Sequence, residues 1–272
     1  LEAVGPPARR VVPGAVLETA SYRGSADGLV GRTIVIEGLS ALQIDVLVQI
    51  ALADGTRHSA ILRPGSPSFT VPESPTGWEV AGAYWRMGTI HILEGIDHLL
   101  FVLALMLLVS GYWMLFKTIT AFSVSHSISL GLATLGFVDM PQKPTEAIIA
   151  LSILFLAVEI VHVRQGRPSV TARYPWVVAF IFGLFHGLGF AGALSEVGLP
   201  QQSIPLALLM FNLGVETGQI LFVAVVIGVV ALIRRLPVVW PEVAWRAAPY
   251  AIGSLAAFWT IERLAASFGS AV

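Results

Sequence analysis

The chain has 272 residues, of which 56% are hydrophobic and 12% are charged, and its formal net charge is −1. A soluble globular protein carries about a quarter charged residues, so this composition is typical of a membrane protein. The low net charge and the lack of a long basic run argue against a nucleic-acid partner. The absence of cysteine excludes disulfides, thiolate metal ligands and cysteine nucleophiles from this chain.

Residues 1–80 have the pattern of a small, β-rich soluble domain. Runs such as "RTIVIEGL" alternate apolar and polar residues, and Asp54-Gly55 separates two such runs, which predicts a β-hairpin. This region contains no signal-peptide core, so we expect that any cleaved signal has already been removed. We expect a folded module here rather than a flexible tail, with a protein partner of its own.

Residues 81–272 have the pattern of a bundle of membrane helices, each of which needs roughly 20 residues to span a bilayer. Six apolar runs are separated by loops rich in proline, glycine and charge. They predict helices over 87–110, 115–137, 145–163, 175–195, 204–233 and 247–267. The predicted fold class is an all-α polytopic membrane protein with about six transmembrane helices and a small N-terminal β-rich soluble domain.

Charged residues in the loops predict the orientation of these helices, because Lys and Arg accumulate on the cytoplasmic side. Seven cations belong to one side and three to the other. The seven are Lys117, Arg164, Arg167, Arg173, Arg234, Arg235 and Arg246, and the three are Arg86, Lys143 and Arg263. We therefore expect a multi-pass protein of the bacterial inner membrane, with the N-terminal domain and the C-terminus in the periplasm.

The first predicted spanning helix carries the segment "HILEGIDHLLF", residues 91–101. On a continuous helix His91, Glu94 and His98 lie within about 60° of one another, with Asp97 at the edge of that face. His91 and His98 are then about 10.5 Å apart along the axis, too far to bind one metal unless the helix is distorted. That spacing favours two sites along a path, or one site and a relay residue.

Further polar residues lie inside the later helices, where ionisable groups are costly and usually functional. Imidazole and carboxylate groups without thiolates suit Zn, Ni, Co or Fe. The expected metal ligands are His91, Asp97, His98, His126 and His186. The expected second shell or proton relay consists of Glu94, Glu159, Asn212, Glu216 and Gln219, of which the last three share one face of the fifth helix.

Five segments, in this order, resemble the HupE/UreJ family of hydrogenase- and urease-accessory membrane proteins. They are "HILEGIDHLLF", "TAFSVSHSISL", "EAIIALSI", "FGLFHGLGFAGAL" and "FNLGVETGQ". The resemblance covers about residues 87–223 and implies a nickel permease. It implies that His91, Asp97 and His98 form one metal motif and that Phe185, His186 and Gly187 form another.

The second motif departs from the permease-type pattern, which continues with another His-Gly and a Glu. This chain has Gly189, Phe190 and Ala191 there, and Ala193 in place of the Glu. The departure indicates the branch of the family that carries a periplasmic N-terminal domain.

Three functions fit these residues. The first is a permease for a divalent metal (Ni, Co or Zn), driven by a gradient or facilitated, because no nucleotide-binding motif is present. The second is an intramembrane zinc-type hydrolase, in which a carboxylate such as Asp97 or Glu216 acts as general base. The third is a non-catalytic accessory subunit of a membrane complex. A transporter needs polar groups spread through the bilayer, whereas a hydrolase needs a compact ligand set, so the spacing of His91 and His98 favours transport.

Overall fold

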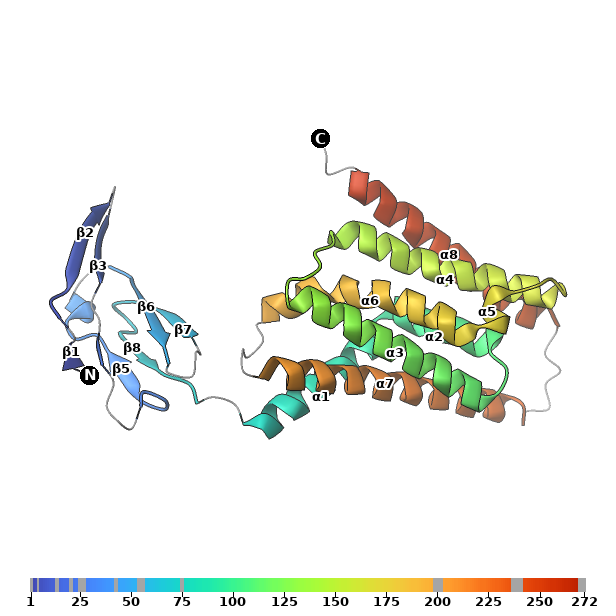
Figure 1. The fold of residues 1–272 in the computed structure, drawn as a ribbon, viewed down its shortest axis with the longest axis horizontal. Helices are drawn as coiled ribbons and strands as arrows, with labels where there is room; N and C mark the ends of the chain where they lie inside the picture. Colours follow the sequence, from blue (N-terminus) through green and yellow to red (C-terminus); the bar gives the residue numbers. More distant parts are fainter. Residues whose placement is uncertain are drawn as a thin grey trace. The chain divides into compact units, whose positions relative to one another are not determined.

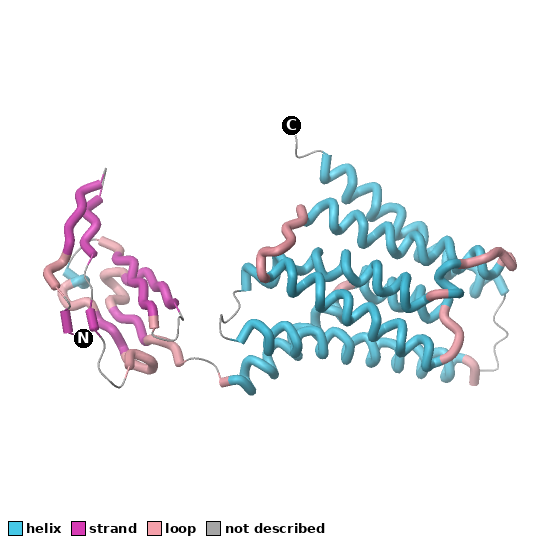
Figure 2. Tube along the Cα trace, in the orientation of Figure 1, coloured by secondary structure: helices cyan, strands magenta, loops and turns pink. Residues whose placement is uncertain are grey.

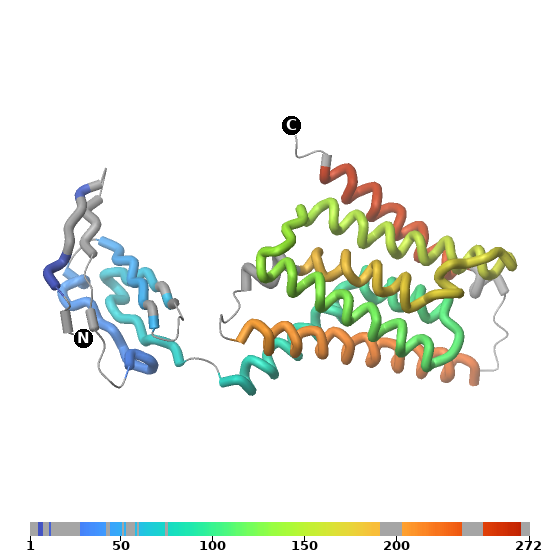
Figure 3. Tube along the Cα trace, in the orientation of Figure 1, coloured from blue at the N-terminus to red at the C-terminus, as the bar shows by residue number. Residues whose placement is uncertain are grey.

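The computed structural model describes the backbone of residues 2–3, 5–12, 15–19, 22–23, 28–41, 44–52, 57–73, 76–197, 203–235 and 242–268. Figure 3 traces the chain from its N-terminus in blue to its C-terminal helix in red. The chain divides into two compact units, Leu1–Thr76 and Gly77–Val272. Strands lie in the first unit and the long helices in the second (Figure 2).

The first unit consists of short antiparallel strand pairs. The pairs are β1 (Glu2–Ala3) with β4 (Tyr22–Arg23), β2 (Ala8–Val12) with β3 (Ala15–Thr19), β5 (Thr33–Val35) with β8 (Ser68–Thr70), and β6 (Val46–Ala51) with β7 (Arg57–Leu62). A 3-10 turn, η1 (Leu39–Ala41), lies between β5 and β6. The predicted hairpin is confirmed by the pairing of Ala51 with Arg57, although Asp54-Gly55 itself lies outside the described residues. Leu39, Leu62 and Val71 are buried in this unit.

The second unit is a helical bundle. Its helices are α1 (Gly77–Glu94), α2 (Ile96–Leu108), α3 (Tyr112–Thr134), α4 (Gln142–Arg164), α5 (Val170–Arg173), α6 (Pro175–Val197), α7 (Ile204–Ile233) and α8 (Glu242–Phe268). The helices pack mainly as three pairs, α1 with α7, α3 with α6 and α4 with α8 (Figure 1). We call the end of the bundle where α1 and α7 begin the Gly77 end, and the end where α2 and α7 finish the Leu108 end.

The described helices confirm the class of a helical membrane protein. Among them α4 and α7 are each long and apolar enough to cross a membrane, and α1 with α2 qualifies as one bent span. Helix α3 has 23 residues, but its Ser, Thr and His side chains lower its hydropathy. The apolar part of α6 that the structure describes, Pro175–Phe190, is shorter. By length and apolarity alone, two of the described helices qualify as membrane spans. The number is three if α1 and α2 together are counted as one span.

The prediction of one continuous helix over 87–110 is wrong. The chain is helical from Gly77, breaks at Gly95 and continues as α2 at an angle of 73° to α1. Gly95 has extended backbone angles, φ −75° and ψ 92°. A Cβ on Gly95 would lie 2.6 Å from His98 Nδ1, so only glycine lets the His98 ring fold back against the break.

Glycines let the paired helices come into backbone contact. A Cβ on Gly183 or Gly187 of α6 would overlap the α3 carbonyl oxygens of Phe122 or His126. On α7, a Cβ on Gly214 would overlap the carbonyl oxygen of Trp85 in α1. Gly183 and Gly187, and likewise Gly214 and Gly218, are spaced as in the small-xxx-small motif of membrane helix pairs.

Two apolar clusters fill the interior of the bundle. The larger lies toward the Leu108 end and includes Phe101, Leu105, Phe122, Ile153 and Leu156, all almost completely buried. The smaller lies toward the Gly77 end and includes Val80, Tyr84, Leu130, Phe211 and Val215. The histidines predicted as ligands lie on α1, α2, α3 and α6 between the two clusters.

Candidate metal centre

Three histidines from three helices meet in the interior of the bundle. His91 of α1, His98 of α2 and His126 of α3 each offer a ring nitrogen, and these nitrogens all lie within 4.8 Å of one another. The ring centroids of His91 and His98 are 5.0 Å apart, and those of His91 and His126 are 6.5 Å apart. No carboxylate belongs to this group among the residues that the structure describes.

The break at Gly95 produces this arrangement. On a straight helix the two histidines of "HILEGIDH" would lie about 10.5 Å apart along the axis. The 73° bend between α1 and α2 instead brings the His98 ring back into edge contact with the His91 ring. The expectation of separated sites is therefore wrong, because it assumed a continuous helix.

The Nε2 atoms of His91, His98 and His126 are buried and make no hydrogen bond with any described residue. Buried polar atoms in proteins nearly always have a partner, so three unpartnered imidazole nitrogens in one place indicate a ligand. Neutral imidazole is a preferred ligand of Zn, Ni and Co. The residues present therefore fit a divalent transition metal.

Asn212 of α7 determines which nitrogen of His126 is available. The Asn212 amide nitrogen donates to the carbonyl oxygen of Leu208 at 2.8 Å, so its Oδ1 faces His126. That oxygen lies 3.0 Å from His126 Nδ1 and can only accept, so Nδ1 carries the proton and Nε2 keeps its lone pair. Asn212 thus orients a ligand from outside the metal's first shell, as metal-binding proteins commonly do.

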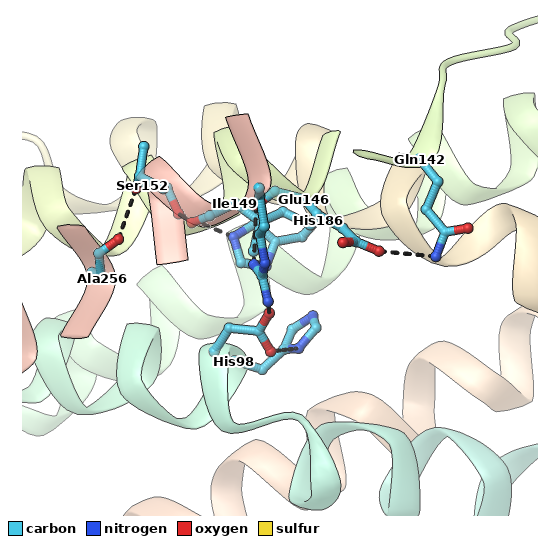
Figure 4. Close-up of polar contacts among 10 residues, drawn as sticks. His98, Gln142, Glu146, Ile149, Ser152, His186 and Ala256 are labelled. Atoms are coloured by element: carbon cyan, nitrogen blue, oxygen red, sulfur yellow. Dashed lines mark hydrogen bonds and ion pairs between the residues drawn. The ribbon is translucent and has the colours of Figure 1, made fainter. Parts of the chain in front are cut away.

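Asp97 lies beside His98 and pairs with Arg263 of α8. Its Oδ2 lies 3.3 Å from Arg263 Nη2, and its Oδ1 lies 3.5 Å from His98 Nδ1 (Figure 4). Arg263 also donates to the carbonyl oxygen of Glu146 at 3.0 Å, which fixes the guanidinium. Asp97 therefore lies between His98 and Arg263 and is not a member of the three-histidine group, and His98 Nδ1 has no hydrogen-bond partner among the described residues.

His186 lies behind His98 and is fully buried between aromatic rings. Its ring centroid is 5.0 Å from that of His98, 5.1 Å from Phe101 and 5.0 Å from Phe122. Ser152 donates to the carbonyl oxygen of Ile149 at 2.6 Å, so its oxygen accepts from His186 Nε2 at 3.1 Å (Figure 4). His186 Nδ1 then has a lone pair, and it has no partner among the described residues.

The remaining predicted residues lie outside the cluster. Glu94 is exposed at the end of α1. Glu159 accepts from Ser169 Oγ at 2.7 Å and from the Thr171 backbone at 2.9 Å, so it holds the short helix α5 in place. Glu216 accepts from Thr120 at 2.6 Å and Gln219 accepts from Ser123 at 3.1 Å. With Asn212 and His126, these two pairs form a row of polar contacts between α3 and α7.

Sequence reasoning missed two residues that support the histidines. It used Arg263 only as one of the three cations on the periplasmic side, although Arg263 binds Asp97 from 166 positions away. It gave no role to Ser152, which fixes the tautomer of His186. A lone serine within the apolar run "EAIIALSI" was the available signal, because hydroxyl groups there often bond to a neighbouring helix.

Comparison with known proteins gives one finding. The family model described as HupE / UreJ protein matches residues 68–263, which include every helix that contributes a histidine to the cluster. No curated protein and no solved structure matches the chain.

Proposed function

The chain belongs to the HupE/UreJ family, and on that premise we propose that it is a membrane permease for a divalent metal of the nickel or cobalt type. The observation that carries this proposal is the set of three Nε2 atoms, at the break between α1 and α2, that have no hydrogen-bond partner in the described part of the chain. His91, His98 and His126 would bind the ion, while Asp97 and Asn212 orient their rings. His186 would either replace one of these three ligands or bind the ion at the next position along the transport path.

The break in the first span supports transport. Transporters commonly bind ions where a spanning helix is interrupted near the middle of the bilayer. The histidine cluster lies at such a break, and apolar clusters separate it from both ends of the bundle. An ion bound there is occluded on both sides, which is an expected stage of alternating access.

Six membrane spans belong to the proposal: α1 with α2, then α3, α4, α6, α7 and α8. Aromatic and cationic residues at the Leu108 end support it, because such residues gather at membrane interfaces. Lys117 lies 4.7 Å from the Trp176 ring centroid, Arg173 lies 5.2 Å from that of Tyr174, and Trp113 is exposed. The Leu108 end would face the cytoplasm, and residues 1–80 would form a periplasmic domain with a protein partner.

The polar row between α3 and α7 would serve as the relay beyond the cluster. Thr120 precedes His126 by six residues on α3, toward the Leu108 end, and its hydroxyl donates to Glu216. A half-buried carboxylate there is available to a proton or to the departing cation. Glu216→Gln keeps the hydrogen bond from Thr120 but removes the charge. This variant therefore distinguishes a role of Glu216 as a relay group from a role in helix packing alone.

A metal-dependent hydrolase is the second candidate, because the three histidines form a compact set with room for a further ligand. A hydrolase also needs a general base within reach of the activated water. Asp97 is paired with Arg263, Glu94 is exposed, and Glu216 contacts Thr120, six residues before His126 on α3. The described carboxylates near the cluster are thus engaged or remote, and this favours the permease.

Uptake into proteoliposomes tests the proposal. Purified protein in sealed vesicles should admit Ni²⁺ or Co²⁺ faster than protein-free vesicles do. His98→Ala should abolish the difference, and Glu216→Gln should bind metal normally but admit it more slowly. Vesicles containing the parent protein that fill no faster than empty vesicles would refute the permease.

A further inference from the structure

Four phenylalanine rings surround the histidines, two toward each end of the bundle. Phe101 and Phe122 lie toward the Leu108 end, with ring centroids 5.1 Å apart. Phe190 and Phe211 lie toward the Gly77 end and stack at 4.9 Å with an interplanar angle of 10°. Phe101, Phe122 and Phe211 are at most 1% exposed, whereas Phe190 is only partly buried. Phe190 is therefore the most exposed of these four rings.

Phe190 makes the closest ring contact with the cluster. Its centroid lies 4.0 Å from that of His91, closer than His98 at 5.0 Å or Phe211 at 5.6 Å. Phe190 follows His186 by one turn of α6, toward the Gly77 end. The phenyl ring thus packs directly against the imidazole of His91, one of the three expected ligands.

We propose that Phe190 determines the coordination number of the site, limiting it to three imidazoles and leaving the remaining position to water. A phenyl ring offers no lone pair, so it occupies the volume without binding the ion. Sites with three protein ligands and an open position exchange ligands, whereas sites with four protein ligands are closed and structural. Phe190 would therefore keep the bound ion exchangeable, and this inference rests on the proposed metal function.

Phe190→His tests the inference, because it puts a fourth imidazole where the phenyl ring lies. The variant should bind Co²⁺ or Ni²⁺ at least about tenfold more tightly and release it more slowly. Competition against a chromophoric chelator, with the purified protein in detergent, measures both quantities. Phe190→Leu supplies no ligand and should show no such gain. Phe182→His is the matched control, because Phe182 is on the same helix and its described ring contacts are with Phe101 and Phe155.

X-ray absorption of the Co²⁺-loaded parent gives a second measurement that does not depend on any variant. It should show three imidazole nitrogens and at least one oxygen donor. Four imidazoles in the parent would overturn the inference, and so would a folded Phe190→His variant that binds metal as Phe190→Leu does. Failure of the parent to bind Co²⁺ or Ni²⁺ at all would instead overturn the metal function itself, and the inference with it.

Discussion

Asn212 acts on the metal centre through a single hydrogen bond. It fixes the proton of His126 on Nδ1 and so leaves Nε2 free for a ligand. Removing such an orienting group typically weakens metal affinity by about 10–100-fold. We predict a loss of this size for Asn212→Ala, measured by chelator competition. Gln219→Ala is the control, because Gln219 lies on the same face of α7 but bonds to Ser123. Equal effects of the two changes would show that both act only through packing.

Gly95 is the second residue whose role can be tested alone. In Gly95→Ala the new methyl group would lie 2.6 Å from His98 Nδ1, so the ring must rotate away from the cluster. We expect metal affinity to fall while helix content, measured by circular dichroism, stays the same. Gly82→Ala provides the comparison, because nothing lies within 4 Å of a Cβ there. Parent-like affinity in Gly95→Ala would mean that His98 does not bind the ion.

The residue types in the sequence were enough to locate the candidate site. They were not enough to assign a role to each residue within it. Buried histidines were recognisable as candidates because an imidazole in a spanning helix is costly without a function. Asp97 was predicted as a ligand because the resemblance to the HupE/UreJ family implies a metal motif of His91, Asp97 and His98. Its interaction with Arg263 is a tertiary contact between α2 and α8, which no local pattern reveals.

At the scale of elements, helix boundaries followed from the sequence, but the break in the first span did not. The helix predicted over 204–233 has the same limits as α7, Ile204–Ile233. The sequence marks both ends of this apolar stretch, with a proline in the first turn and Arg234-Arg235 after the last. A single glycine in an apolar helix is often tolerated, so Gly95 gave no clear signal of a 73° bend.

The pairing of α1 with α7 makes another prediction at this scale. In Gly214→Ala the added methyl group would overlap the Trp85 carbonyl oxygen and push α1 away from α7. Overpacking of this kind costs about 1–3 kcal/mol. We expect a lower melting temperature and weaker metal binding, because α1 carries His91. Gly228→Ala, on the same helix with nothing within 4 Å of a Cβ, should match the parent. A parent-like melting temperature in Gly214→Ala would contradict the close packing.

For the whole molecule, the proposed orientation can be tested by labelling, because the chain has no cysteine. Ser66 and Gln165 are exposed and lie in the first unit and at the Leu108 end, respectively. An impermeant thiol reagent applied to intact spheroplasts should label Ser66→Cys and not Gln165→Cys. Labelling should become equal after the membrane is permeabilised. The opposite pattern in intact spheroplasts would reverse the orientation.

The metal content of the purified protein tests the account most directly, since the account depends on one ion held by His91, His98 and His126. Protein purified in mild detergent without chelators and loaded with Ni²⁺ or Co²⁺ should contain one bound ion per chain. His98→Ala and His126→Ala should each lose that ion, while His162→Ala, which lies beside Glu159 at the end of α4, should keep it. Unchanged stoichiometry and affinity in both cluster variants would contradict the account.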